Sequence, residues 1–168
     1  MVNDVAVFLA HALALEEEAA DRYSELADTM AVHHNDDVAA LFRRMASFSR
    51  MHADAVRGRA ANVELPHFKP WEYQWDGPEG AETGPGDRTH YLMTPYHCLQ
   101  FALTNERRGR DFYDGVAKST TDDEVRRLAE QMVAEESEHV LVLEQWLGQT
   151  PKPPADWDAD PDPPVVND

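Results

Sequence analysis

The chain has 168 residues, which is enough for one domain and short for two. It carries 15 Lys and Arg against 32 Asp and Glu, a net charge of −17. That balance argues against a nucleic-acid or anionic-membrane partner, because both require basic residues, and it favours cations as partners. The one cysteine excludes an intrachain disulfide and a zinc or iron–sulfur site ligated by four cysteines of the chain.

No segment resembles a targeting or membrane-spanning element. The N-terminal residues 1–4 lack a basic region, and the apolar stretch Val5–Leu15 runs directly into Glu16, Glu17 and Glu18. We therefore expect a cytoplasmic protein.

Two long helices are predicted in the first part of the chain. The first runs from Asn3, as N-cap, to about Val32, with apolar residues spaced by threes and fours. The second starts at Asn35 and ends between Arg57 and Asn62.

Two more helices are predicted in the second part. The third starts at Thr94 and Pro95, a capping residue followed by proline at the first helical position. The fourth starts at Thr121, with Glu124 completing a capping-box pattern, and Gly148 closes it.

The links predict how these helices are arranged. The links at residues 33–34 and 119–120 are short, which makes each pair of helices antiparallel neighbours. The segment 62–93 is long enough to be a crossover that runs the length of a bundle. We expect an all-α four-helix bundle, two antiparallel hairpins joined by this crossover, over residues 1–148. Residues 149–168 form a Pro- and Asp-rich tail, predicted to be extended, with six of the chain's 11 prolines.

The two predicted hairpins resemble each other in sequence. The first and third helices share a motif in which Glu is followed by a small residue and then by Tyr, at an offset of 90 residues (106 − 16). It consists of Glu16, Ala19 and Tyr23 in the first helix and of Glu106, Gly109 and Tyr113 in the third. The second and fourth helices share a stripe at an offset of 87 (139 − 52), in which Ser49 and His52 correspond to Glu136 and His139.

These polar residues lie in register with apolar ones, so two hairpins packed face to face would bring them to one level. An unpaired charge in such a core costs several kcal/mol, which is a large part of the free energy of unfolding of a typical domain. A bound cation is the simplest compensation, because carboxylates and imidazoles together are ligands for Fe, Mn or Zn. Glu136 and His139 stand on adjacent turns of one face, so both can reach one metal centre.

Several neighbouring residues have simpler interpretations. Glu17 and Glu18 are expected on a solvated face of the first helix. In the fourth helix, Glu135 competes with Glu136 for the inward position. The repeat favours Glu136, because it is the residue that corresponds to Ser49. Tyrosines such as Tyr23 and Tyr113 are more often core residues than redox residues. The remaining candidates are expected to be structural or surface residues: His11, His90, His97 and Cys98.

The order of ligand types along the four helices resembles the ferritin-like di-iron carboxylate proteins, in particular the rubrerythrin-like branch. The resemblance covers about residues 3–147. It implies Glu16, His52, Glu106, Glu136 and His139 as metal ligands, with Glu136 as the bridge. Ser49, Tyr23 and Tyr113 would lie beside the ligands.

The chain departs from that family pattern at two positions. Ser49 stands where the second bridging Glu is expected, and Gly109 stands where rubrerythrins carry an extra carboxylate. The rubredoxin-like iron centre common among rubrerythrins needs four cysteines, so the single cysteine excludes it as well.

The resemblance implies a non-haem di-iron oxidoreductase that reacts with O2 or peroxide and takes electrons from a separate donor. Two Fe ions are expected, a single Fe ion is an alternative that stays open, and Mn or Zn are alternative metals. Two other functions stay open: a metal-binding or iron-buffering protein with a non-redox site, and a metal-free helical interaction module. The aromatic residues Trp71, Tyr73 and Trp75 in the crossover favour a homodimer.

Overall fold

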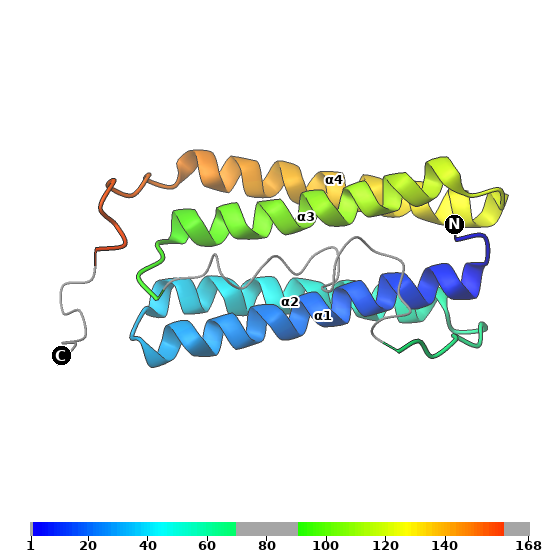
Figure 1. Ribbon diagram of the computed structural model, residues 1–168, viewed down its shortest axis with the longest axis horizontal. Helices are drawn as coiled ribbons and strands as arrows, with labels where there is room; N and C mark the ends of the chain where they lie inside the picture. The colour runs from blue at the N-terminus through cyan, green and yellow to red at the C-terminus, as the bar shows by residue number, and fades with distance from the viewer. Residues whose placement is uncertain (1, 70–90, 160–168) are drawn as a thin grey trace, which may run out of the picture.

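The computed structural model describes residues 2–69 and 91–159. In these ranges the chain forms four helices: α1 (Val5–Val32), α2 (Asp36–Arg59), α3 (Pro95–Ser119) and α4 (Asp123–Gln149). Figure 1 shows the α1–α2 hairpin and the α3–α4 hairpin lying along each other, which gives an elongated bundle. The expected all-α four-helix bundle is therefore confirmed. Residues 70–90, which include His90 and the crossover aromatics Trp71, Tyr73 and Trp75, lie outside the described residues.

Two helix starts differ from the sequence prediction by one residue. The N-caps are Asp4 and Asp122 rather than Asn3 and Thr121, and the Asp4 carboxylate accepts a hydrogen bond from the backbone N–H of Val7 at 3.0 Å. A carboxylate at this position also interacts favourably with the positive end of the helix dipole. The Asn3 side chain instead accepts a hydrogen bond from the Thr121 backbone at 3.0 Å and so joins the start of α1 to the α3–α4 link.

The other predicted boundaries agree closely with the structure. α2 ends at Arg59, inside the predicted interval, and Thr94 caps α3 as expected. α4 continues one residue beyond Gly148, to Gln149, because a helical glycine weakens a helix without forcing its end.

The α1–α2 link also fixes the start of the second hairpin. It consists of His33 and His34, and His34 adopts the left-handed backbone conformation with φ of 58°. The Asn35 side-chain amide then donates to the carbonyls of Tyr91 at 3.1 Å and Met93 at 2.6 Å. One short link thus holds the first hairpin against the chain that enters α3.

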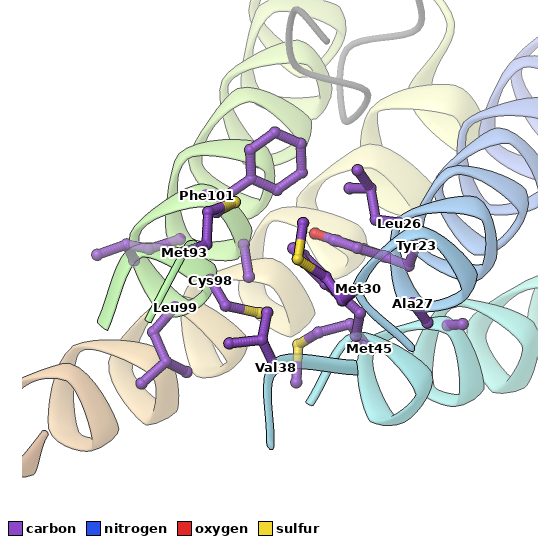
Figure 2. Packing of buried hydrophobic residues seen from close by; sticks show 14 of the residues in the cluster. Tyr23, Leu26, Ala27, Met30, Val38, Met45, Met93, Cys98, Leu99 and Phe101 are labelled. Atoms are coloured by element: carbon purple, nitrogen blue, oxygen red, sulfur yellow. The ribbon is translucent and has the colours of Figure 1, made fainter. Parts of the chain in front are cut away.

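The buried apolar residues form two clusters, one toward each end of the bundle. The cluster near the α1–α2 link is shown in Figure 2, where Tyr23 and Met30 from α1 face Cys98 and Phe101 from α3. The Phe101 ring packs edge-on against Tyr23, with ring centroids 6.3 Å apart. The other cluster is built around Phe8 and Tyr113. The buried polar residues of the mid-helix positions lie between these clusters in the chain.

The described part of the C-terminal tail returns to the bundle. The Trp157 ring lies 3.9 Å from the His97 ring, centroid to centroid, and packs against the cluster near the α1–α2 link. None of the helices in the described part of the chain combines the length and the hydropathy that a membrane crossing requires.

Candidate metal centre

The polar mid-helix residues come from all four helices. α1 carries Glu16, α2 carries Ser49 and His52, α3 carries Glu106, and α4 carries Glu136 and His139. The first of these, Glu16, is 4% exposed, as are Ser49 and Glu136. The side chains of Glu106 and His52 are more accessible, at 16% and 24%, so the site is open on one side.

Each histidine lies beside a carboxylate of its own hairpin. The Nδ1 atom of His139 is 3.2 Å from Glu106 Oε2 and 3.3 Å from Glu136 Oε2. The Nδ1 atom of His52 is 3.6 Å from Glu16 Oε2. The second hairpin therefore places two carboxylate oxygens around its imidazole and the first hairpin places one.

The two halves meet through their histidines. The His52 and His139 rings are stacked with centroids 4.3 Å apart and planes 6° from parallel. Donor atoms of His52, Glu136 and His139 all lie within 4.8 Å of one another. One cation could accept ligands from both hairpins at this point.

Burial and mutual proximity shift the pKa values of these groups. Burial raises the pKa of Glu16, and it raises that of Glu136 to about 9. The pKa of Glu106 is lowered although burial opposes this, because His139 and Glu136 hydrogen bond to its carboxylate. Burial likewise opposes the charged form of His139, but the hydrogen bonds to Glu106 and Glu136 outweigh it and raise the pKa to about 10. Without a cation, the cluster therefore retains protons, which keeps its net negative charge small.

The acidic residues next to the inward glutamates in the sequence have different partners, because they form ion pairs with arginines. Glu17 pairs with Arg57 and Glu135 pairs with Arg59, both toward the outside of the bundle. Among the described residues, no Lys or Arg forms an ion pair with the three inward glutamates, Glu16, Glu106 and Glu136. Buried carboxylates whose partners are imidazoles rather than Lys or Arg fit a divalent metal, because the imidazoles can serve as ligands and the metal supplies positive charge. The geometry also places Glu136, rather than Glu135, beside His139.

The three residues that were expected beside the ligands, Tyr23, Tyr113 and Ser49, are all buried. The Tyr23 hydroxyl accepts a hydrogen bond from the Asn105 side chain at 3.3 Å. Tyr113 packs edge-on against Phe8, with ring centroids 6.1 Å apart. Ser49 is buried on α2, one turn before His52.

Sequence reasoning missed Asn105, which is 2% exposed and directly precedes Glu106. A signal for it exists, because the offset of 90 residues makes Asn105 correspond to the apolar Leu15. An amide at a core position of one hairpin only indicates a specific hydrogen bond there.

Comparisons with known proteins agree with this arrangement. A rubrerythrin family model matches residues 8–69, and a ferritin-like domain model matches residues 95–166. The crystal structure of an uncharacterized conserved protein from Magnetospirillum magnetotacticum MS-1 is 47% identical in sequence, with a TM-score of 0.69. The match covers 90% of this chain and 98% of that one. The chain belongs to the ferritin-like superfamily, in its rubrerythrin-like branch. No curated protein matches it.

Membership in the ferritin-like superfamily gives the internal repeat a structural meaning. The two family matches fall on different halves of the chain, one on the α1–α2 hairpin and one on the α3–α4 hairpin. Each hairpin thus places a Glu and a His of its own in the polar cluster between the helices. Within this rubrerythrin-like bundle, Ser49 is the point at which the two contributions differ.

Proposed function

We propose that the chain is a non-haem metal protein with a carboxylate–imidazole centre for two metal ions, and that its function is oxidation–reduction with O2 or peroxide. The observation that carries this proposal is the convergence of Glu16, Glu106 and Glu136 with His52 and His139 in a buried site that has no Lys or Arg partner among the described residues. Iron is the expected metal, because this ligand set combines hard carboxylates with imidazole. Manganese and zinc are alternatives with the same ligands.

The two hairpins would hold the ions in different ways. Glu16 and His52 would serve one ion, Glu106 and His139 the other, and Glu136 would lie between them. When bound as Fe(II), the two ions would supply the electrons needed to reduce O2 or a peroxide. Such chemistry would also need an electron donor from outside the chain, because the chain has one cysteine and so cannot hold an iron centre ligated by four cysteines of its own.

The protein's own groups provide the charge and the seclusion of this site. Glu16 and Glu136 are buried, so their carboxylates interact with a cation in a medium of low dielectric. The protons that Glu136 and His139 retain would leave when a cation enters. The partly exposed edges of His52 and Glu106 leave one side through which a small oxidant can approach.

A metal-binding or iron-buffering function is the second candidate, and Ser49 favours it. A serine side chain is neutral and too short to bridge two cations that a glutamate would span. The site therefore has one carboxylate fewer than it would have with a glutamate at position 49. α2 offers no other buried acid near Ser49, and Glu64, after the end of that helix, is exposed. A site of this kind could bind metal and lack the redox cycle.

Two measurements test the proposal. Elemental analysis of the protein from iron-supplemented cells should give between one and two metal ions per chain, and a value near zero would leave only a metal-free interaction module. Stopped-flow absorbance after mixing the anaerobic Fe(II) protein with O2 or H2O2 then separates the two metal-binding functions. Rapid oxidation is expected of the oxidoreductase, whereas a slow change that matches free Fe(II) would indicate buffering.

A further inference from the structure

A cavity of about 230 Å3 lies between α2 and α4 and reaches the candidate centre. His52, Glu106 and His139 form the polar part of its wall. O2 or H2O2 would not need a space of this size, since a water molecule occupies only about 30 Å3 in the liquid. The rest of the wall is apolar and consists of Met45, Phe48, Met51, Val142, Leu143 and Trp146.

The cavity opens to the surface through apolar side chains. Met51 and Val142, which line it, are 58% and 42% exposed. They are two of the four large hydrophobic residues that are strongly exposed in the described part of the chain. Exposed hydrophobic residues around a concave site are typical of a binding pocket for an apolar molecule. The rim therefore favours entry of an apolar molecule from solution.

The wall offers no partner for a charged ligand. Outside the candidate centre, none of the described residues that line the cavity carries a charge. Within the centre, Glu106 Oε2 is already 3.2 Å from His139 Nδ1. Arg44 does not line the cavity, because it lines a separate hollow together with Asp37 and Leu99. An ion that entered the cavity would lose its hydration without gaining a partner, so the wall selects an uncharged molecule.

Two aromatic residues of the wall are held in place from the neighbouring hollow. The guanidinium carbon of Arg44 lies 4.5 Å from the ring centroid of Trp146 and 5.5 Å from that of Phe48. Such stacking restricts the motion of both rings. This part of the wall is therefore ordered before a ligand enters, which lowers the entropic cost of binding.

We propose that this cavity binds an uncharged hydrocarbon, such as a small alkylbenzene, directly beside His52 and His139. A cavity of about 150 Å3 holds benzene, so by proportion the larger space here suits a molecule of about nine carbons. Because it names an organic substrate class for the same centre, this inference rests on the proposed function. Binding itself requires only the cavity wall, and it can be measured without metal or turnover.

The first test compares three ligands of similar size and different charge. Titration calorimetry with propylbenzene, phenylacetate and 2-phenylethylammonium is carried out on the metal-free protein and on the redox-inert Zn(II) protein. Propylbenzene is expected to bind at one molecule per chain, and both ions are expected to bind at least tenfold more weakly. Propylbenzene that binds neither form of the protein, or an ion that binds as tightly as propylbenzene, would overturn the proposal.

The second test locates the ligand in the native chain. Met45 and Met51 line the cavity, whereas Met132 belongs to the other apolar cluster, around Phe8 and Tyr113. With methyl-labelled methionine, propylbenzene should shift the NMR signals of Met45 and Met51, because the ring current of a bound benzene ring acts on nearby methyl groups. The signal of Met132 should stay in place. Calorimetric binding without a shift at Met45 or Met51 would place the ligand elsewhere and refute this cavity as its site.

The third test fills the cavity and has a matched control. Val142→Trp places an indole in the wall of the cavity, whereas Leu141→Trp places one on the adjacent residue, which is 65% exposed and does not line the cavity. Propylbenzene affinity should fall at least tenfold in Val142→Trp and stay unchanged in Leu141→Trp, with thermal unfolding used to confirm that both variants fold. Equal affinity in the two variants would contradict binding in the cavity.

The outcomes also distinguish this inference from the proposed function. Propylbenzene binding in a protein that takes up no metal would uphold the cavity and refute the metal centre, whereas metal uptake without propylbenzene binding would do the reverse. A light-scattering mass of two chains that falls to one in Val142→Trp, without propylbenzene binding, would identify the rim as an interface between copies and overturn the proposed ligand site.

Discussion

The two halves of the candidate centre have the same plan but unequal numbers of carboxylates beside the imidazole. In the second hairpin the imidazole of His139 has two carboxylate oxygens within 3.3 Å, from Glu106 and Glu136. In the first hairpin His52 has one, from Glu16 at 3.6 Å. The difference arises at one pair of corresponding positions, because Ser49 stands where Glu136 stands in the repeat. The two hairpins of similar sequence thus differ in the number of carboxylates that lie beside the imidazole.

Charge explains why this single difference matters. Two divalent ions bring four positive charges, and the three inward glutamates return only three negative ones. In a site of low dielectric that imbalance disfavours the second ion. We therefore expect the side of Glu106, Glu136 and His139 to bind metal more tightly than the side of Glu16 and His52.

The largest effect is expected from breaking the stronger half. Glu136→Ala and His139→Ala should each remove most of the bound metal, because their donor atoms lie within 4.8 Å of each other and of His52, and we propose Glu136 as the ligand that the two ions share. Elemental analysis of the purified variants measures this. Glu135→Ala is the matched control, since Glu135 is adjacent in sequence but pairs with Arg59 on the outside. Native metal content in both site variants would contradict the assignment.

Making the halves equal should have the next largest effect. Ser49→Glu restores a carboxylate opposite Glu136 and should tighten the weaker metal site at least tenfold, as one added charge-assisted ligand is worth about 1.5–3 kcal/mol. Titration calorimetry with Mn(II) or Zn(II) measures both affinities, and Ser49→Ala serves as the control that adds no charge. Two equally tight sites in the native protein, with no gain in the variant, would show that Ser49 is not a defect.

The sequence was sufficient to predict the fold because the relevant signals are local and repeated. Helix starts, short links and the apolar stripes depend on neighbours within a few residues, so they are visible without any tertiary information. The corresponding positions of the two hairpins then selected Glu136 over Glu135. The N-caps were shifted by one residue because Asn3 and Asp4, like Thr121 and Asp122, are both capable caps, and only tertiary contacts decide between them.

The cavity and the Asn105 contact could not be predicted in the same way. The cavity wall combines Phe48 of α2 with Val142 of α4, and no local pattern says that these helices leave space between them. Likewise, the hydrogen bond from Asn105 joins α3 to Tyr23 of α1, residues that are 82 positions apart. Such contacts depend on side-chain placement after the hairpins have met.

A smaller difference between the halves concerns Asn105, which corresponds to the apolar Leu15 in the repeat. Its side-chain amide donates a hydrogen bond to the hydroxyl of Tyr23. Tyr23→Phe leaves that buried amide donor without this acceptor, and it should lower the free energy of unfolding by about 1 kcal/mol. Urea denaturation measures the loss, and Tyr113→Phe supplies the comparison. An unchanged unfolding midpoint in Tyr23→Phe would refute a stabilising role for this bond.

The smallest expected effect concerns His11, which the repeat places opposite Phe101. His11 is 1% exposed, its Nδ1 atom lies 2.8 Å from the Val7 carbonyl, and burial lowers its pKa. Because the folded pKa lies below the unfolded one, the unfolded chain takes up the proton first as the pH falls. The stability contributed by neutral His11 is therefore complete above the unfolded pKa of about 6.5 and is lost as the pH falls through the folded pKa.

His11→Phe removes this titration and gives the first hairpin the residue type of the second. The free energy of unfolding of the variant should fall less steeply than that of the native chain when the pH is lowered from about 7.5 to 5.5, by less than the one-proton limit of about 1.4 kcal/mol per pH unit. Urea denaturation at both pH values measures the two slopes. The apolar ring also remains compatible with the site, since Phe112 already stacks on His11 with ring centroids 6.4 Å apart. Parallel pH profiles for the two proteins would show that His11 takes up its proton without unfolding, and that this end of the first hairpin is less well shielded from water than its burial indicates.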